Sequence, residues 1–151
     1  MEIWQRLIVI LFGLFSIIVF LKGVNESLKK NNSYAGTIPL LWMGIFVWGD
    51  AVVYGAFWAL CCFTVLLLND WLLFLLLFSV YWTVRSLGET IFWFNQQFTP
   101  MKLYHAPKLP GYKFFNNESI YFIYQIFCQC ITVVSLITTI YLSAIWLQSR
   151  F

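Results

Sequence analysis

Three ionisable side chains, Asp50, Arg85 and Glu89, stand inside long apolar stretches of the sequence. A carboxyl group can take up and release a proton, and a guanidinium can hold a carboxylate through two parallel hydrogen bonds. Charged groups are costly to place in apolar surroundings, so they usually face one another or a polar interior. These three residues are therefore the first candidates for a functional site.

A very short turn, Asn69–Asp70, joins the two stretches that carry these residues. In an antiparallel helix hairpin, residues equally far from the turn lie at one level, which places Asp50 beside Glu89. Arg85 precedes Glu89 by one turn of helix. At 1.5 Å per residue, it therefore lies about 6 Å nearer to Asn69–Asp70. We predict that Arg85 bridges the two carboxylates.

This buried charge cluster has two interpretations. A path for protons or cations through a membrane needs a titratable acid among its lining groups, and Asp50 or Glu89 meets that need. Alternatively, the cluster only pins the two helices in register. Both interpretations require that the surrounding stretches are helices and that water does not reach them freely.

Composition indicates a membrane protein. The 151 residues are 62% hydrophobic, 21% aromatic and only 10% charged, whereas soluble domains carry about 25% charged residues. A soluble fold of this length could not hide so much apolar surface. The net charge is +3, and the basic residues fall in the gaps between apolar stretches rather than in one patch, which excludes nucleic-acid binding.

Four apolar stretches are long enough to cross about 30 Å of hydrocarbon as helices. They cover residues 3–21, 38–68, 71–98 and 119–147. The predicted fold is therefore all-α: a polytopic integral membrane protein with four transmembrane helices in a small bundle. We expect a single transmembrane domain over residues 1–151, with a tight hairpin between the second and third helices.

Two further patterns predict how the helices pack. Small residues at four-residue spacing in the second stretch let another backbone approach closely, either from the same chain or from a second copy. They are Ala51, Gly55 and Ala59. Polar residues in the fourth stretch form one helical stripe, which we expect to make interhelical hydrogen bonds or to line a cavity. They are Gln125, Gln129, Thr132, Ser135 and Thr139.

Metal, cofactor and catalytic signatures are not evident in the sequence. The four cysteines lie in apolar stretches without C-x-x-C spacing, and His105 is the only histidine, so we predict no metal site and no cofactor. Nucleotide-binding loops and hydrolase motifs are missing. An enzyme is therefore the least favoured class, and a lipid-acting enzyme within the membrane is the form it would take.

Basic residues predict the orientation in the membrane. Residues 22–37 and 99–118 each hold three lysines, whereas the opposite side holds only Arg6 and Arg150. The positive-inside rule then places these two loops in the cytoplasm and both termini outside. Three N-x-S triplets in the same loops, at Asn25, Asn31 and Asn117, would be glycosylated only on the other side of the membrane.

The leading functional hypothesis is a small, non-enzymatic membrane protein that acts as a transporter-like or auxiliary subunit. Its active region would be the charge cluster facing the polar stripe of the fourth helix. The alternative is a purely structural membrane adaptor or oligomerisation protein, in which the cluster serves only as an adhesive contact. The expected partners are the lipid bilayer and either further copies of the chain or another membrane protein.

Overall fold

The computed structural model describes residues 1–100, 102, 104–109, 111–115 and 117–149, with only the backbone described at positions 38 and 108. Within this part of the chain the elements are helical, which confirms the predicted all-α class. The long helices are α1 (Ile3–Val24), α2 (Trp48–Leu68), α3 (Trp71–Phe98) and α5 (Ser119–Gln148). The short ones are η1 (Asn25–Lys29), η2 (Ile38–Met43), η3 (Ala106–Lys108) and α4 (Tyr112–Phe115).

Four of these helices are long and apolar enough to cross a membrane: α1 together with η1, then α2, α3 and α5. Their outward faces carry many exposed leucine, isoleucine, valine and phenylalanine side chains. The contacts divide the chain into two compact units, Met1–Leu77 and Phe78–Phe151. The single transmembrane domain stays a prediction.

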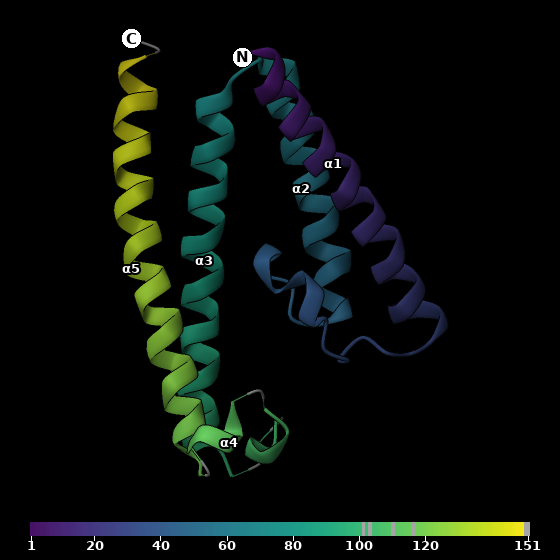
Figure 1. Cartoon of the computed structure of the whole chain (residues 1–151), viewed down its shortest axis with the longest axis vertical. Coiled ribbons are helices and arrows are strands. Elements are labelled where there is room, and N and C mark those ends of the chain that lie inside the picture. The colour runs from purple at the N-terminus through teal and green to yellow at the C-terminus, as the bar shows by residue number, and fades with distance from the viewer. Residues whose placement is uncertain (101, 103, 110, 116, 150–151) are drawn as a thin grey trace. The chain divides into compact units, whose positions relative to one another are not determined.

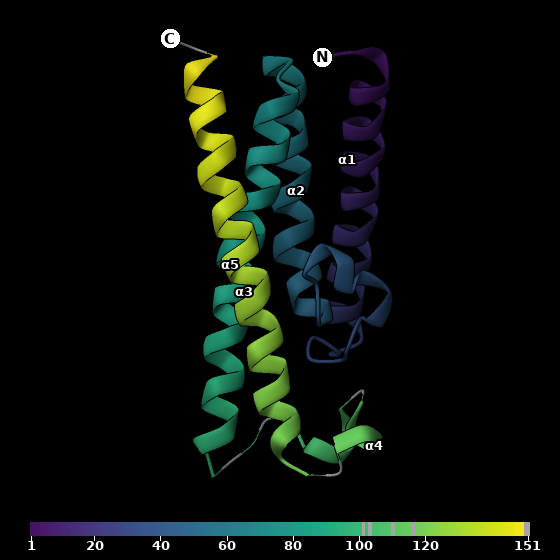
Figure 2. The ribbon, with the colours of Figure 1, turned by 60° about the vertical axis from the view of Figure 1, so that its left-hand side comes forward.

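In the first unit, α1 and α2 run antiparallel and side by side (Figure 1, Figure 2). Glycines make the close approach possible, as two contacts show. A Cβ atom at Gly55 would lie 2.8 Å from the backbone nitrogen of Phe20, and one at Gly23 would lie 2.8 Å from the Cβ atom of Ala51. Ala51 and Gly55 of α2 are therefore buried against α1 of the same chain. Ala59, the third small residue of α2, is only partly buried.

The second apolar stretch differs from the predicted continuous helix over residues 38–68. Its first part forms the 3-10 helix η2, which ends at Gly44 in the left-handed region with φ 69°. Val47 is extended, and α2 begins only at Trp48. Pro39 has no backbone N–H to donate, and a left-handed residue such as Gly44 ends a right-handed helix. The apolar run therefore continues through a break in the backbone.

A tight turn separates α2 from α3. Asn69 closes α2 in the left-handed region with φ 52°, and the Asp70 carboxylate accepts a hydrogen bond from the backbone N–H of Leu73 at 3.0 Å, which satisfies a free donor in the first turn of α3. Arg6 of α1 donates to the Asn69 side chain at 2.9 Å. The start of α1 is thus tied to the turn.

In the second unit, the part of α3 from Phe78 onward lies alongside α5 (Figure 2). The observed bounds are Trp71–Phe98 for α3 and Ser119–Gln148 for α5. The ranges predicted from the sequence are 71–98 and 119–147. The Asn117 side chain accepts a hydrogen bond from the N–H of Ser119 at 2.9 Å. This contact satisfies one free N–H donor in the first turn of α5.

Candidate functional site

Arg85 and Glu89 form an ion pair within α3, with 2.7 Å between Nη1 and Oε1. The two side chains are only 13% and 12% exposed. They are also the only charged residues of this 28-residue helix. The pair lies close to the middle of a helix that is long enough to span a membrane, where an unpaired charge is most costly.

Asp50 lies in the first turn of α2 and belongs to the other compact unit. Its Oδ2 atom accepts a hydrogen bond from the backbone N–H of Phe46 at 3.0 Å. A carboxylate in the first turn also interacts favourably with the positive end of the helix dipole. Asp50 therefore fastens the segment that precedes α2, and the predicted bridge from Arg85 to Asp50 stays a prediction.

Hydroxyl side chains of α3 and α5 meet in a row that we call the hydroxyl seam. It consists of Ser79, Thr83 and Ser86 on α3 and Thr132, Ser135 and Thr139 on α5. Ser79 donates to the carbonyl of Ser135 at 2.9 Å and lies 2.7 Å from the hydroxyl of Thr139. Thr132 donates to the hydroxyl of Ser86 at 2.9 Å. Three members of the α5 stripe thus bond to a neighbouring helix.

The glutamines of the stripe lie nearer the start of α5. Gln97 of α3 donates to the Oε1 atom of the buried Gln125 at 2.6 Å. Gln129, one turn further on, is partly buried. Gln97 also donates to the carbonyl of Trp93 at 3.4 Å. The amide contact therefore continues the polar row beyond the hydroxyl seam toward the end of α3.

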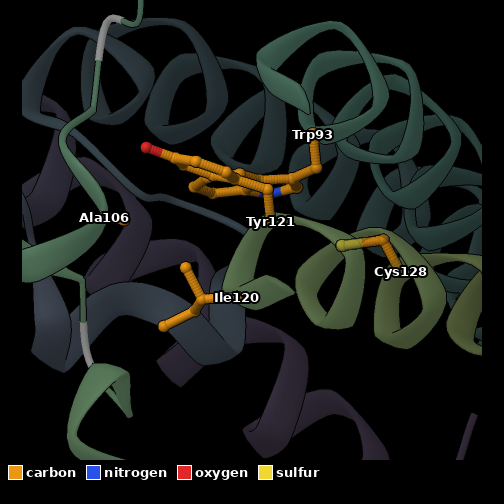
Figure 3. Close-up of a cluster of buried hydrophobic side chains, with 5 residues drawn as sticks. All are labelled: Trp93, Ala106, Ile120, Tyr121 and Cys128. Carbon is orange, nitrogen blue, oxygen red and sulfur yellow. The ribbon is translucent and has the colours of Figure 1, made fainter. Parts of the chain in front are cut away.

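Buried hydrophobic side chains of the second unit form a cluster of Trp93, Ala106, Ile120, Tyr121 and Cys128, on which further aromatic rings pack (Figure 3). The Trp93 ring stacks on Tyr124 with centroids 4.7 Å apart and faces Tyr121 at 6.3 Å. Tyr121 donates its hydroxyl hydrogen to the carbonyl of Tyr104 at 2.6 Å. Lys102 lies 4.9 Å above the Tyr121 ring and also forms an ion pair with Glu118 of the same loop. These contacts hold the loop after α3 against both helices.

Sequence reasoning missed several of these residues. Ser79, Thr83 and Ser86 repeat at four- and three-residue intervals, the same spacing that revealed the stripe on α5, so the signal was present. The glycines of α1 that receive α2 gave no comparable pattern. Among the described residues, no three His, Cys, Asp or Glu side chains gather closely enough to hold a metal ion.

The geometry provides one paired charge in an apolar helix and one row of hydroxyl groups that are already hydrogen-bonded. These groups form a packed interface between α3 and α5, with the ion pair on α3. Comparison with models of protein families, with curated proteins and with solved structures found no match to this chain.

Proposed function

We propose that this chain is a multi-pass integral membrane protein that acts as a non-enzymatic subunit, either transporter-like or auxiliary to another membrane protein. The supporting observation is the Arg85–Glu89 ion pair, 2.7 Å long and largely shielded within an otherwise uncharged helix. Placing two charges in such surroundings carries a desolvation penalty of several kcal/mol per ion. A retained pair of this kind is a functional-site hypothesis in its own right.

Uncharged groups also hold α3 against α5, and this supports a functional role for the ion pair beside a structural one. Arg85 and Glu89 are one turn apart on a single helix, so the bond between them holds no second helix in place. Uncharged groups join α3 to α5 through the hydroxyl seam and the Gln97–Gln125 amide bond.

The hydroxyl seam bears on the choice between a path and a partner surface. The hydroxyls of Thr132 and Thr139 and the backbone carbonyl of Ser135 bond to α3, which favours a sealed interface over a water-filled route between these two helices. The opposite face of α5 is apolar and exposed, including Phe127, Val134 and Tyr141. That face is available to lipid or to a helix of another membrane protein, as an auxiliary subunit requires.

Orientation completes the proposal. The loops over residues 22–37 and 99–118 lie in the cytoplasm and both termini lie outside, in line with the distribution of lysine and arginine. A protease added to sealed, oriented vesicles tests this arrangement, because it should remove a tag on either terminus only from the outer side. Cleavage of the terminal tags only from the cytoplasmic side would reverse the assignment.

Carbodiimide labelling of the reconstituted protein tests the functional proposal. An apolar carbodiimide modifies carboxyl groups that are protonated within the bilayer. If Glu89 takes part in a proton or cation path, the intact mass increases by one adduct that is lost in Glu89→Gln and kept in the control Glu2→Gln, and wild-type vesicles show flux that Glu89→Gln lacks.

An auxiliary subunit predicts a different result from the same preparation. Glu89 stays unlabelled and flux is absent, while native mass spectrometry from mild detergent shows a second membrane protein in fixed stoichiometry. That complex should be lost in the charge-swapped variant Arg85→Glu/Glu89→Arg or in Glu89→Ala. Absence of labelling, flux and any stoichiometric partner would contradict the proposal.

A further inference from the structure

The segment between α1 and α2 does not stay at the end of the helices. After a loop over residues 30–35 the chain turns back and runs beside them before α2 begins (Figure 1). The Trp42 ring of η2 contacts Phe12 at 6.0 Å and stacks on Phe15 at 5.6 Å, measured between ring centroids. Both phenylalanines belong to the middle of α1.

These ring contacts give the depth that the segment reaches. Phe15 precedes Val24, the last residue of α1, by nine positions, or about 13 Å at 1.5 Å per residue. Lys22 is the charged residue in the last turn of α1, where the apolar part of the helix ends. Its ammonium lies 5.0 Å above the Trp48 ring. Measured from Lys22, Phe15 still lies about 10 Å further along the helix, well inside a hydrocarbon core of about 30 Å.

The side chains of the segment suit that depth. The run over residues 38–48, IPLLWMGIFVW, contains no charged side chain. Met43 and Ile45 are almost fully buried within the first unit. Leu41 and Trp42 face outward and are 41% and 52% exposed. A water-facing connection rarely presents adjacent large apolar side chains, whereas a lipid-facing one does.

The backbone of the segment also meets the requirement of an apolar environment, where each unsatisfied polar group costs several kcal/mol. Thr37 donates its N–H to the carbonyl of Phe46 and its hydroxyl to that of Ile45, both at 2.8 Å. Gly44 donates to Leu41 at 2.9 Å. The Asp50 carboxylate accepts the N–H of Phe46 at 3.0 Å. The segment is thus a hydrogen-bonded hairpin with Asp50 at its base.

We infer that residues 36–47 form a re-entrant hairpin that enters the bilayer from the side of the α1–α2 connection and returns to the same side, with Leu41 and Trp42 against lipid acyl chains. The inference rests on the proposed membrane insertion of α1. It gives Asp50 a second assignment, since its carboxylate closes the hairpin where the chain turns into α2.

Cysteine accessibility in liposomes tests the inference. Leu41→Cys is compared with Tyr34→Cys, which stands in the preceding loop and is 79% exposed, and with Leu11→Cys, which is 57% exposed on α1. A water-soluble maleimide is supplied on both sides of the membrane, and labelling is measured above the wild-type background. All three positions are exposed on the first unit, so burial inside that unit does not make them differ.

We expect Tyr34→Cys to react quickly and Leu41→Cys and Leu11→Cys to react more than about tenfold more slowly, because the maleimide needs a hydrated thiolate. Fast labelling of Leu41→Cys beside a protected Leu11→Cys would overturn the re-entrant hairpin while leaving the membrane proposal intact. Fast labelling of Leu11→Cys would overturn the membrane insertion of α1 itself.

Dilution of the protein in lipid separates acyl chains from a second copy of the chain as the covering partner. Protection of Leu41→Cys that persists at a low protein-to-lipid ratio supports contact with lipid. Protection that disappears on dilution, while Leu11→Cys stays protected, would assign the surface to another copy and contradict the inference.

Discussion

Substitution of Gly55 by alanine should loosen the packing of α1 against α2. The added Cβ atom would lie 2.8 Å from the backbone nitrogen of Phe20 and 2.9 Å from its Cα atom, whereas carbon contacts prefer about 3.5–4.0 Å. Backbone atoms cannot swing aside, so α1 must move away by several tenths of an ångström. Overpacking of this kind costs typically 1–3 kcal/mol, and the rigid neighbour here favours the upper part, about 2–3 kcal/mol.

Alanine has a better helix propensity than glycine, which stabilises the variant by about 1 kcal/mol. The free energy of unfolding should therefore fall by about 1–2 kcal/mol in total. At about 2–4 °C per kcal/mol for a chain of this size, the apparent Tm of Gly55→Ala should fall by about 2–8 °C. A thiol-reactive dye follows the unfolding in detergent, because Cys62 on α2 is only 2% exposed in the folded protein.

Gly88→Ala is the matched control, since it is the same substitution within a long helix. A Cβ atom at Gly88 meets nothing within 4 Å, so only the propensity term remains and the apparent Tm should stay unchanged or rise by about 2–4 °C. The reasoning is refuted if Gly55→Ala melts at or above the wild-type temperature, or if the two variants lose stability equally.

Three other predictions concern the second unit. Arg85→Ala should destabilise the protein by about 3–5 kcal/mol because it leaves Glu89 charged and shielded, and the double variant Arg85→Ala/Glu89→Ala should recover part of that loss in the same melting assay. A double-mutant cycle of Ser79→Ala and Thr139→Val should give a coupling of about 0.6 kcal/mol, typical of hydroxyl bonds between membrane helices; additive losses would contradict the bond. Tyr121→Phe removes the hydrogen bond to the loop carbonyl and should cost about 1 kcal/mol, with faster amide exchange in the loop before α5 and none of this change in Tyr141→Phe.

The bounds of α3 and α5 lie close to the predicted ranges because each helix is a mainly apolar stretch bounded by turn residues. Asn69 and Asp70 stop α2 and start α3, and Pro100 follows the last turn of α3. Such boundaries depend on local backbone chemistry, which single residues reveal. The all-α class followed from the same reasoning, since runs of this length and composition have few other ways to satisfy their backbone.

The break between η2 and α2 could not be read from hydropathy, because the apolar run continues through it. The local signals were Pro39, Gly44 and Gly49, spread over a stretch that contains no polar residue before Asp50. Each is tolerated within a membrane helix. We attribute the break to packing, because Met43 and Ile45 are almost fully buried and Trp42 packs on Phe12 and Phe15 of α1.

Long-range pairings were predictable in part. The stripe on α5 was evident from its spacing, but its partners were not, because a period identifies a face and not the helix that covers it. Gly13 and Gly23 show the same limit: each meets a residue of α2, Cys62 and Ala51, and neither glycine stands in a pattern of its own. Complementary surfaces become visible only when both helices are placed.

Asp50 has two assigned roles that a pair of substitutions can separate. If its main contribution is the hydrogen bond from the N–H of Phe46, then Asp50→Asn keeps an acceptor oxygen in place and should lose less than about 1 kcal/mol, apart from the charge–dipole term. Asp50→Ala removes the oxygen that accepts the Phe46 N–H and should cost about 1–3 kcal/mol.

If Asp50 instead pairs with Arg85, as the spacing of the sequence predicts, the negative charge is what matters and Asn should be nearly as harmful as Ala. Melting of both variants in the Arg85→Ala background completes the test. Losses that add fully to that of Arg85→Ala assign Asp50 to the hairpin alone, whereas a coupling of 0.5 kcal/mol or more, about the lower limit for residues in contact, assigns it to the charge cluster as well. The ratio of the Asn and Ala effects thus measures how much of the carboxylate serves the backbone and how much serves the guanidinium.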